Sequence, residues 1–199
     1  NNSLTMSGWI NINEWKQNTV FDGTSSASNN PNRNAGFKLV LSENGLFHVF
    51  VGIVVDHPES ALSSISTLPL SQWVYISAVR SGSILQLYIN GQLDAERTDL
   101  STNDISYDGH EYESDLYKIG CLSDINNPQG LYYFHDGMSS FELYNIALEP
   151  TQIQSYMANP PIGNESGLVG YWNFNAGSGD ILYDHSGNGN HGTINGASW

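Results

Sequence analysis

The sequence has very few basic residues, a single cysteine and no long apolar run. Six Lys and Arg oppose twenty Asp and Glu in 199 residues, which leaves a formal net charge of −14. Nucleic acid and anionic membrane surfaces repel such a chain, so we expect neither as a partner. No apolar run approaches the length of a membrane span, so membrane insertion is not expected either. No signal peptide is present and the chain begins at Asn1 without Met, which indicates a processed product or a piece of a larger protein.

Disulfide chemistry and the common catalytic motifs are also missing. Cys121 is the only cysteine, so no internal disulfide can form. There is no nucleophile elbow, no histidine spacing typical of zinc sites, and no glycine loop that opens a helix to hold phosphate. The acids Glu111, Glu113 and Asp115 alternate as in some glycosidases. Because Tyr107–His110 before them is typical of a loop, we interpret the run as a solvated acidic loop.

Short alternating patterns dominate what is present, and 20 glycines with a 12% aromatic share fit a sheet protein with many turns. Strands are predicted over Leu4–Ile12, Phe37–Leu41, Leu46–Val51, Trp73–Arg80, Ile84–Asn90, Leu116–Leu122, Gly137–Tyr144 and Leu168–Phe174. Loops are predicted over Phe21–Gly36 and Asp56–Ser71, and Pro150–Met157 is the one convincing helix. About ten short strands without helix alternation indicate an all-β, antiparallel two-sheet sandwich.

The C-terminal stretch joins a strand to a polar loop whose side chains carry oxygen at every second position. The loop residues are Asp184, Ser186, Asn188 and Asn190. They match positions one, three, five and seven of an EF-hand calcium loop, with Gly189 at position six. Position twelve is Asn195 instead of Glu, and no helices flank the loop. We therefore predict a weak Ca²⁺ site, completed by backbone carbonyls or by an acid such as Asp22 or Asp136. A hairpin turn that uses Asn and Gly for positive φ is the alternative.

Several weak motifs in order make the chain similar to a known family. They are Ser7–Ile10, Gln72–Ile76 leading to Leu87–Gly91, Tyr144–Leu148, and the run YWNFNAGSGDILYDHSGNGNHGTI from Tyr171 to Ile194. The chain resembles laminin-G-like, concanavalin A-type lectin/glucanase domains over nearly its whole length. The resemblance implies a jelly-roll sandwich in one domain over residues 1–199, with 159–167 as a linker to the closing strand. In that family the YWNF-type segment usually opens a domain, whereas here it closes the chain.

The resemblance also implies where a ligand would bind. Alternation places His48, Tyr75, Gln86 and Tyr88 opposite the apolar residues of their strands, and in this fold that face is the concave one. Tyr132 and Tyr133, in a loop, are expected to add to the same sugar site. The tryptophans Trp9, Trp15, Trp73, Trp172 and Trp199 are expected mostly in the core.

The resemblance leads to the expectation of a non-catalytic, calcium-dependent carbohydrate-binding or adhesion domain. It would act outside the cell or at the cell surface, with a glycan as partner or, as second choice, a cell-surface protein. Two alternatives stay open: a glycosidase or polysaccharide lyase of the same fold, and a purely structural repeat of an adhesin or fibre. The oligomeric state and the identity of the glycan do not follow from the sequence.

Overall fold

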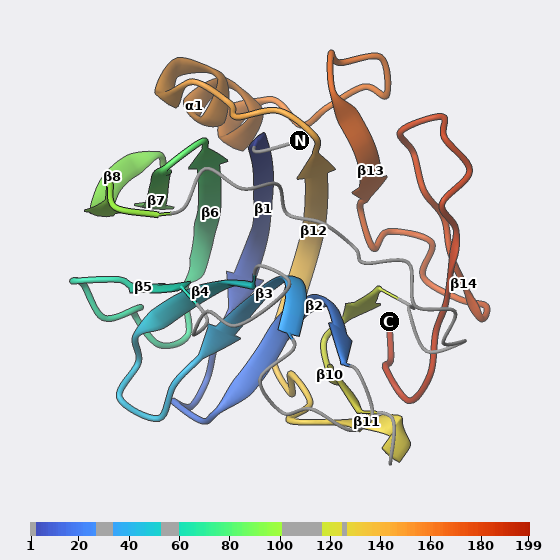
Figure 1. The fold of residues 1–199 in the computed structure, drawn as a ribbon. Helices are drawn as coiled ribbons and strands as arrows, with labels where there is room; N and C mark the ends of the chain where they lie inside the picture. Colours follow the sequence, from blue (N-terminus) through green and yellow to red (C-terminus); the bar gives the residue numbers. More distant parts are fainter. Residues whose placement is uncertain (1–2, 27–33, 53–59, 101–116, 125–126) are drawn as a thin grey trace.

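Two antiparallel sheets lie face to face in the computed structural model, which describes residues 3–26, 34–52, 60–100, 117–124 and 127–199 (Figure 1). The six-stranded sheet has the order β13 (Leu168–Trp172), β12 (Gly137–Tyr144), β1 (Ser3–Asn11), β6 (Trp73–Ser81), β7 (Ile84–Ile89) and β8 (Gln92–Arg97). The five-stranded sheet has the order β5 (Ser60–Ser63), β4 (Phe47–Gly52), β3 (Asn34–Leu41), β2 (Asn18–Ser26) and β9 (Lys118–Ile119). Two hairpins are also present, β10 (Leu122–Asp124) with β11 (Asn127–Leu131) and β14 (Ile181–Leu182) with β15 (Gly192–Thr193). The predicted antiparallel sandwich is confirmed.

The main core fills the space between the two sheets. Met6 and Ile10 of β1 join Leu39 of β3 and Val49 of β4 in one buried apolar cluster. These residues alternate along their strands, so the side chains between them point to the outside of the sandwich. Gly8 lies in the same row as Met6 and Ile10, and a Cβ there would come within 2.5 Å of the Ser140 carbonyl oxygen. The register predicted for the first strand is therefore confirmed, and its glycine allows β12 to approach closely.

The outer face of the six-stranded sheet carries a second, smaller core under the helix α1 (Pro150–Ala158). The helix begins with Pro150, and the Gln152 side chain accepts a hydrogen bond from the Glu149 backbone N–H. Such a proline and capping box are typical of a helix N-terminus, and they explain why this helix was predictable. Ile153 is the fully buried residue of α1, against Tyr144 and its neighbours. In the described part of the chain, no helix is both long and apolar enough to cross a membrane.

Several strands have polar sequences, and the sequence patterns did not predict them. Strands β2 and β3 enter the predicted loop Phe21–Gly36 from its two ends, and β5 lies inside the predicted loop Asp56–Ser71. Those two loop predictions are wrong because ladder hydrogen bonds come from the backbone and do not require apolar side chains. The polar edge strand β8 was missed for the same reason. The acidic run Glu111–Asp115 lies outside the described residues.

The C-terminal segment closes the six-stranded sheet of its own chain. β13 pairs antiparallel with β12, and Trp172 enters the main core while Tyr171 belongs to the cluster under α1. The strand ends at Trp172, two residues before the predicted end, and Phe174 then takes a positive φ of 47°. The prediction that this segment supplies the closing strand is confirmed.

Candidate functional site

The residues of the predicted sugar site do not form one surface. His48 lies on β4 in the five-stranded sheet, whereas Tyr75, Gln86 and Tyr88 lie on β6 and β7 in the six-stranded sheet. All of them face away from the core between the sheets, so they lie on opposite sides of the sandwich. The prediction of a single patch is wrong because alternation separates inside from outside but does not say to which sheet a strand belongs.

On the six-stranded sheet, the predicted ligand residues make internal hydrogen bonds. Tyr75 and Tyr88 are 1% and 2% exposed. The Tyr88 hydroxyl donates to Gln86 Oε1 at 2.9 Å, and Gln86 Nε2 donates to Glu96 Oε2 at 2.7 Å. Trp9 packs against Tyr75 with ring centroids 5.3 Å apart. These groups stabilise the outer face of the sheet and leave the two tyrosine rings inaccessible to a ligand.

A buried carboxyl group lies at the centre of the same face. Glu142 on β12 is 1% exposed, the Tyr75 hydroxyl donates to its Oε2 at 2.6 Å, and Ser140 Oγ donates to its Oε1 at 3.1 Å. Burial raises the pKa of Glu142 to about 7, although both hydrogen bonds act to lower it. Burial also raises the pKa of Tyr75, and the neighbouring Glu142 charge adds to that effect. Sequence reasoning missed this cluster, because Glu142 alternates with apolar residues like any surface acid.

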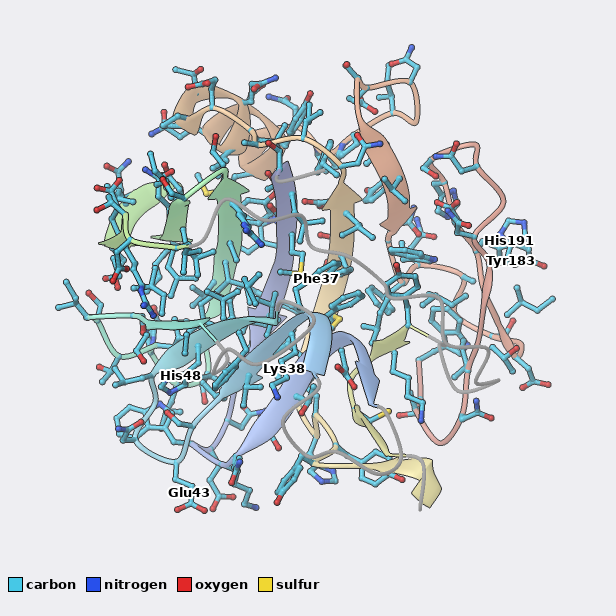
Figure 2. All side chains as sticks on the ribbon, viewed as in Figure 1. Phe37, Lys38, Glu43, His48, Tyr183 and His191 are labelled. Carbon is cyan, nitrogen blue, oxygen red and sulfur yellow. The ribbon has the colours of Figure 1, made fainter. Side chains whose placement is uncertain are left out.

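His48 lies on the outer face of the five-stranded sheet, where Figure 2 labels it together with Lys38 of β3. Its Nδ1 lies 2.7 Å from Ser63 Oγ and its Nε2 lies 2.9 Å from Ser42 Oγ. Burial lowers the pKa of His48. Lys38 Nζ lies 4.8 Å from the centroid of the Phe50 ring, a cation–π contact. Both ring nitrogens of His48 are thus engaged by serines, which fixes the ring.

The loop predicted to bind calcium, residues 184–190 and hereafter the Asp184 loop, folds back onto the free edge of β13. Asp184 Oδ1 accepts hydrogen bonds from the backbone N–H groups of Tyr171 and Ser186, at 3.0 and 2.8 Å. Asp184 Oδ2 accepts from Ser186 Oγ at 2.8 Å and from the Asn190 N–H at 2.9 Å. Burial raises the pKa of Asp184, but these hydrogen bonds outweigh it and hold the pKa below its ordinary value.

The other polar side chains of the Asp184 loop also point to the strand. Asn188 Nδ2 donates to the Leu168 and Val169 carbonyl oxygens, both at 3.0 Å, and Asn190 Nδ2 donates to Val169 O at 2.8 Å. Ser186 Oγ lies 3.1 Å from the same Val169 oxygen. An edge strand normally exposes these carbonyls to other chains, so the Asp184 loop seals that edge.

The oxygens of Asp184 are used by hydrogen bonds within the chain. A calcium ion needs six to eight oxygens turned toward one point. Here the Asp184 oxygens already accept four hydrogen bonds, and the amide groups of Asn188 and Asn190 present nitrogen to β13. No cluster of three or more His, Cys, Asp or Glu suited to a metal occurs among the residues that the structure describes. Calcium binding by this loop stays a prediction, and the structure gives the loop a role that needs no metal.

A group of exposed aromatic residues lies at the end of the sandwich where β1 ends and β6 and β12 begin, away from α1 (Figure 1). We call it the loop-end cluster; it comprises Trp15, Trp73, Tyr132 and Tyr133, with Asn13, His135 and Asp136 beside them. The exposed fractions of the four aromatic residues are 39%, 48%, 49% and 40%. The expectation that most tryptophans lie in the core is wrong for Trp15, Trp73 and Trp199, whereas Trp172 is buried.

Hydrogen bonds and close packing hold the loop-end cluster together. Asp136 Oδ1 accepts from the Asn13 backbone N–H at 3.0 Å and from Asn13 Nδ2 at 3.1 Å. The Trp73 ring reaches across the strand ladder to Gly137, where an added Cβ would lie 3.4 Å from the ring. On the other flank, Trp15 Nε1 donates to the Leu68 carbonyl at 3.0 Å. Trp15 and Trp73 are thus held in position while they remain partly exposed.

The backbone of the loop-end cluster is strained at an exposed residue. Tyr132 has a φ of 48°, a left-handed conformation that bulky side chains rarely adopt. Its carbonyl oxygen accepts a hydrogen bond from the Thr19 N–H at 2.8 Å. The rings of Tyr133 and His135 lie 6.2 Å apart. Strain of this kind tends to be retained where a side chain must be presented to a ligand.

Of the six predicted ligand residues, the structure leaves Tyr132 and Tyr133 exposed at the surface and brings Trp15, Trp73 and Asp136 to the same end. The sequence signal for the added residues is weak. Trp73 precedes an apolar strand and follows a turn, so its position at the start of the strand could be predicted from the sequence. Its exposure to solvent could not. Planar rings beside a carboxylate and amide groups suit a ligand that has both apolar faces and hydroxyl groups.

The chain belongs to the concanavalin A-like lectin/glucanase superfamily, since the Laminin_G_3 family model of that superfamily matches residues 1–154. The match ends within α1, so β13 and the Asp184 loop lie beyond it. No curated protein matches the sequence.

Solved structures share the fold at low sequence identity. A proposed carbohydrate-binding protein from Bacteroides ovatus has a TM-score of 0.72 and 16% identity, over 98% of this chain and 52% of its own. The CBM40 module of Ruminococcus gnavus IT-sialidase, bound to α2,3-sialyllactose, has a TM-score of 0.64 and 13% identity, over 78% and 83%. Leech intramolecular trans-sialidase has a TM-score of 0.64 and 14% identity, over 82% and 24%. The likeness shows the fold alone, and this chain spans about half the length of the Bacteroides protein.

Proposed function

We propose that this chain is a non-catalytic carbohydrate-binding module that holds its glycan at the loop-end cluster. The observation that carries the proposal is the set of four exposed aromatic residues at the end of the sandwich where Asp136 and Asn13 are hydrogen-bonded to each other. Aromatic faces stack on the apolar faces of sugar rings, and the polar groups beside them bind hydroxyls. The family and the carbohydrate-binding proteins of the same fold support this choice of ligand.

A glycosidase is the weaker candidate. Its chemistry needs two carboxyl groups on either side of the scissile bond, one of them with a raised pKa. Glu142 has the raised pKa, but it is 1% exposed and hydrogen-bonded to Tyr75 and Ser140, so a substrate does not reach it.

An extracellular or cell-surface location and a calcium requirement are separate parts of the proposal. The location is supported by the glycan ligand, since glycans are displayed on cell surfaces. The calcium requirement rests on the sequence spacing of the Asp184 loop only. A single comparison of glycan binding with calcium and with a chelator tests it.

The proposal is tested by glycan binding to variants with matched controls. Trp73→Ala and Tyr132→Ala remove rings that are 48% and 49% exposed, and Trp199→Ala and Tyr183→Ala remove rings that are 43% and 49% exposed elsewhere. An array identifies a ligand, and titration calorimetry then measures its affinity. The first two variants should each bind about fivefold more weakly, because stacking on an aromatic ring contributes roughly 1 kcal/mol.

The controls decide between local and general effects. Trp199 and Tyr183 lie in the C-terminal segment, where Figure 2 shows Tyr183 beside His191. Their replacement should leave the affinity unchanged. Equal losses in all four variants, or none in the first two, would place the ligand elsewhere on the molecule.

A further inference from the structure

The charges around the loop-end cluster restrict which glycan it can hold. We infer that the loop-end cluster takes a neutral glycan and discriminates against one that carries a carboxylate, such as a sialylated chain. This inference rests on the proposed function. It concerns this chain's own residues, and it differs from the ligand of the Ruminococcus module, which was solved with sialyllactose.

The first observation is the charge at the cluster itself. Asp136 is hydrogen-bonded to Asn13, and Glu14 lies in the same loop as Asn13 and Trp15. Lys16, in the same loop, has its Nζ 2.6 Å from Glu14 Oε2. The hydrogen bond and charge of Glu14 raise the pKa of Lys16, so the two side chains neutralise each other. The charge that remains in the cluster is the negative charge of Asp136.

The second observation is how Asp136 is used. Its Oδ1 accepts both hydrogen bonds from Asn13, while Oδ2 receives none from the described residues. A carboxylate oxygen is an acceptor only, so it binds the hydroxyl hydrogens of a neutral sugar. A ligand carboxylate in the same place offers no hydrogen and brings a second negative charge.

The third observation is the surroundings of the other described cations. Arg97 Nε lies 2.5 Å from Asp99 Oδ1, and Arg80 is 1% exposed. Lys38 packs on the Phe50 ring. Lys118 pairs with the buried Asp22 between strands β9 and β2. Arg33 is outside the described residues. Recognition of a carboxylate in proteins relies on a positioned Arg or Lys. With a net charge of −14, the whole chain also repels acidic ligands at long range.

The test uses an array on which each neutral oligosaccharide stands next to its counterpart with a terminal sialic acid, at pH 7.5 in low salt. We expect neutral glycans to bind, and the sialylated counterparts to bind about two- to fivefold more weakly, as expected for like charges several ångströms apart in water. Because salt screens this repulsion, the difference should shrink at 0.5 M NaCl.

A charge variant sharpens the test. Glu14→Gln frees Lys16, so the ratio of sialylated to neutral binding should rise about fivefold. Glu96→Gln removes the same charge far from the cluster. Glu96 pairs with Gln86 of β7, and Gln86 pairs with Val79 of β6. Val79 is six residues from Trp73 along β6, a distance of roughly 20 Å. That control should leave the ratio unchanged.

The outcomes separate this inference from the proposed function. Sialylated glycans that bind as tightly as their neutral counterparts, or more tightly, overturn the neutral-ligand inference and leave the carbohydrate-binding function standing. A chain that binds no glycan at either salt concentration overturns both. Neutral preference together with the Glu14→Gln shift supports both.

Discussion

Two loops of this molecule share an aspartate and a histidine but hold the aspartate in different ways. The Asp184 loop and the loop Tyr132–Asp136 each combine aspartate, histidine and a neighbouring tyrosine. In the Asp184 loop the aspartate accepts four hydrogen bonds and is 7% exposed. In the loop Tyr132–Asp136 the aspartate accepts two from a single residue, and the aromatic rings face solvent. Residue types alone therefore do not distinguish a loop that stabilises the fold from one that can bind.

The depth of burial and the number of donors together decide the charge of a buried carboxyl group. Asp184 and Glu142 are both buried, and burial acts to raise the pKa of each. Four hydrogen bonds reverse that effect at Asp184, whereas the two hydroxyls around Glu142 do not. We therefore expect Asp184 to stabilise the fold as an anion and Glu142 to stabilise it as a neutral acid.

The largest effect is expected at Asp184. Asp184→Ala leaves the N–H groups of Tyr171, Ser186 and Asn190 without their acceptor, so the free energy of unfolding should fall by roughly 3 kcal/mol or more. Urea denaturation of Asp184→Ala against wild type measures it. Asp180→Ala, four residues earlier on an exposed position, is the control and should change stability little.

The same experiment in calcium and in chelator tests the calcium prediction. If the Asp184 loop acts through hydrogen bonds, wild type should be equally stable in both solutions, and Asp184→Ala should lose the same amount in both. Stabilisation of wild type by calcium that disappears in Asp184→Ala would restore the metal site and show that the loop rearranges to bind the ion.

The next effect is the pH dependence from Glu142. Its folded-state pKa of about 7 lies above the ordinary value of 4.5, so the folded state binds the extra proton. The stability due to Glu142 is fully present below about pH 4.5, falls as the pH rises, and is lost once the pH passes about 7. The total loss is roughly 3 kcal/mol for a shift of this size.

Glu142→Gln isolates this contribution, since the amide keeps the shape and stays neutral. The difference in free energy of unfolding between variant and wild type should increase from pH 4.5 to pH 7 in favour of the variant, and then level off. Urea denaturation at several pH values measures it. A difference that is constant with pH would mean that Glu142 is already ionised in the folded protein.

Much of the fold could be predicted from the sequence, because it depends on local patterns. Alternation identified β1, β6, β7 and β12, and Pro150 located the helix. The pairing of strands into two sheets could not be predicted, so His48 was grouped with Tyr75 across the sandwich. The contacts of the Asp184 loop could not be predicted either. The spacing from Asp184 to Asn190 is the same whether the side chains surround an ion or form hydrogen bonds with β13.

The smallest effect is expected at Tyr132, where stability and glycan binding should respond in opposite ways. Asparagine tolerates a positive φ better than tyrosine, so Tyr132→Asn should relieve backbone strain while it removes a half-exposed ring. Tyr133→Asn removes a similar ring without that relief, because Tyr133 has no positive φ. Tyr132→Asn should therefore be more stable than Tyr133→Asn by about 1 kcal/mol in urea denaturation, yet bind glycan more weakly than wild type. Equal stability of the two variants would mean that the Tyr132 conformation costs nothing, and the strain would then be no argument for a binding role.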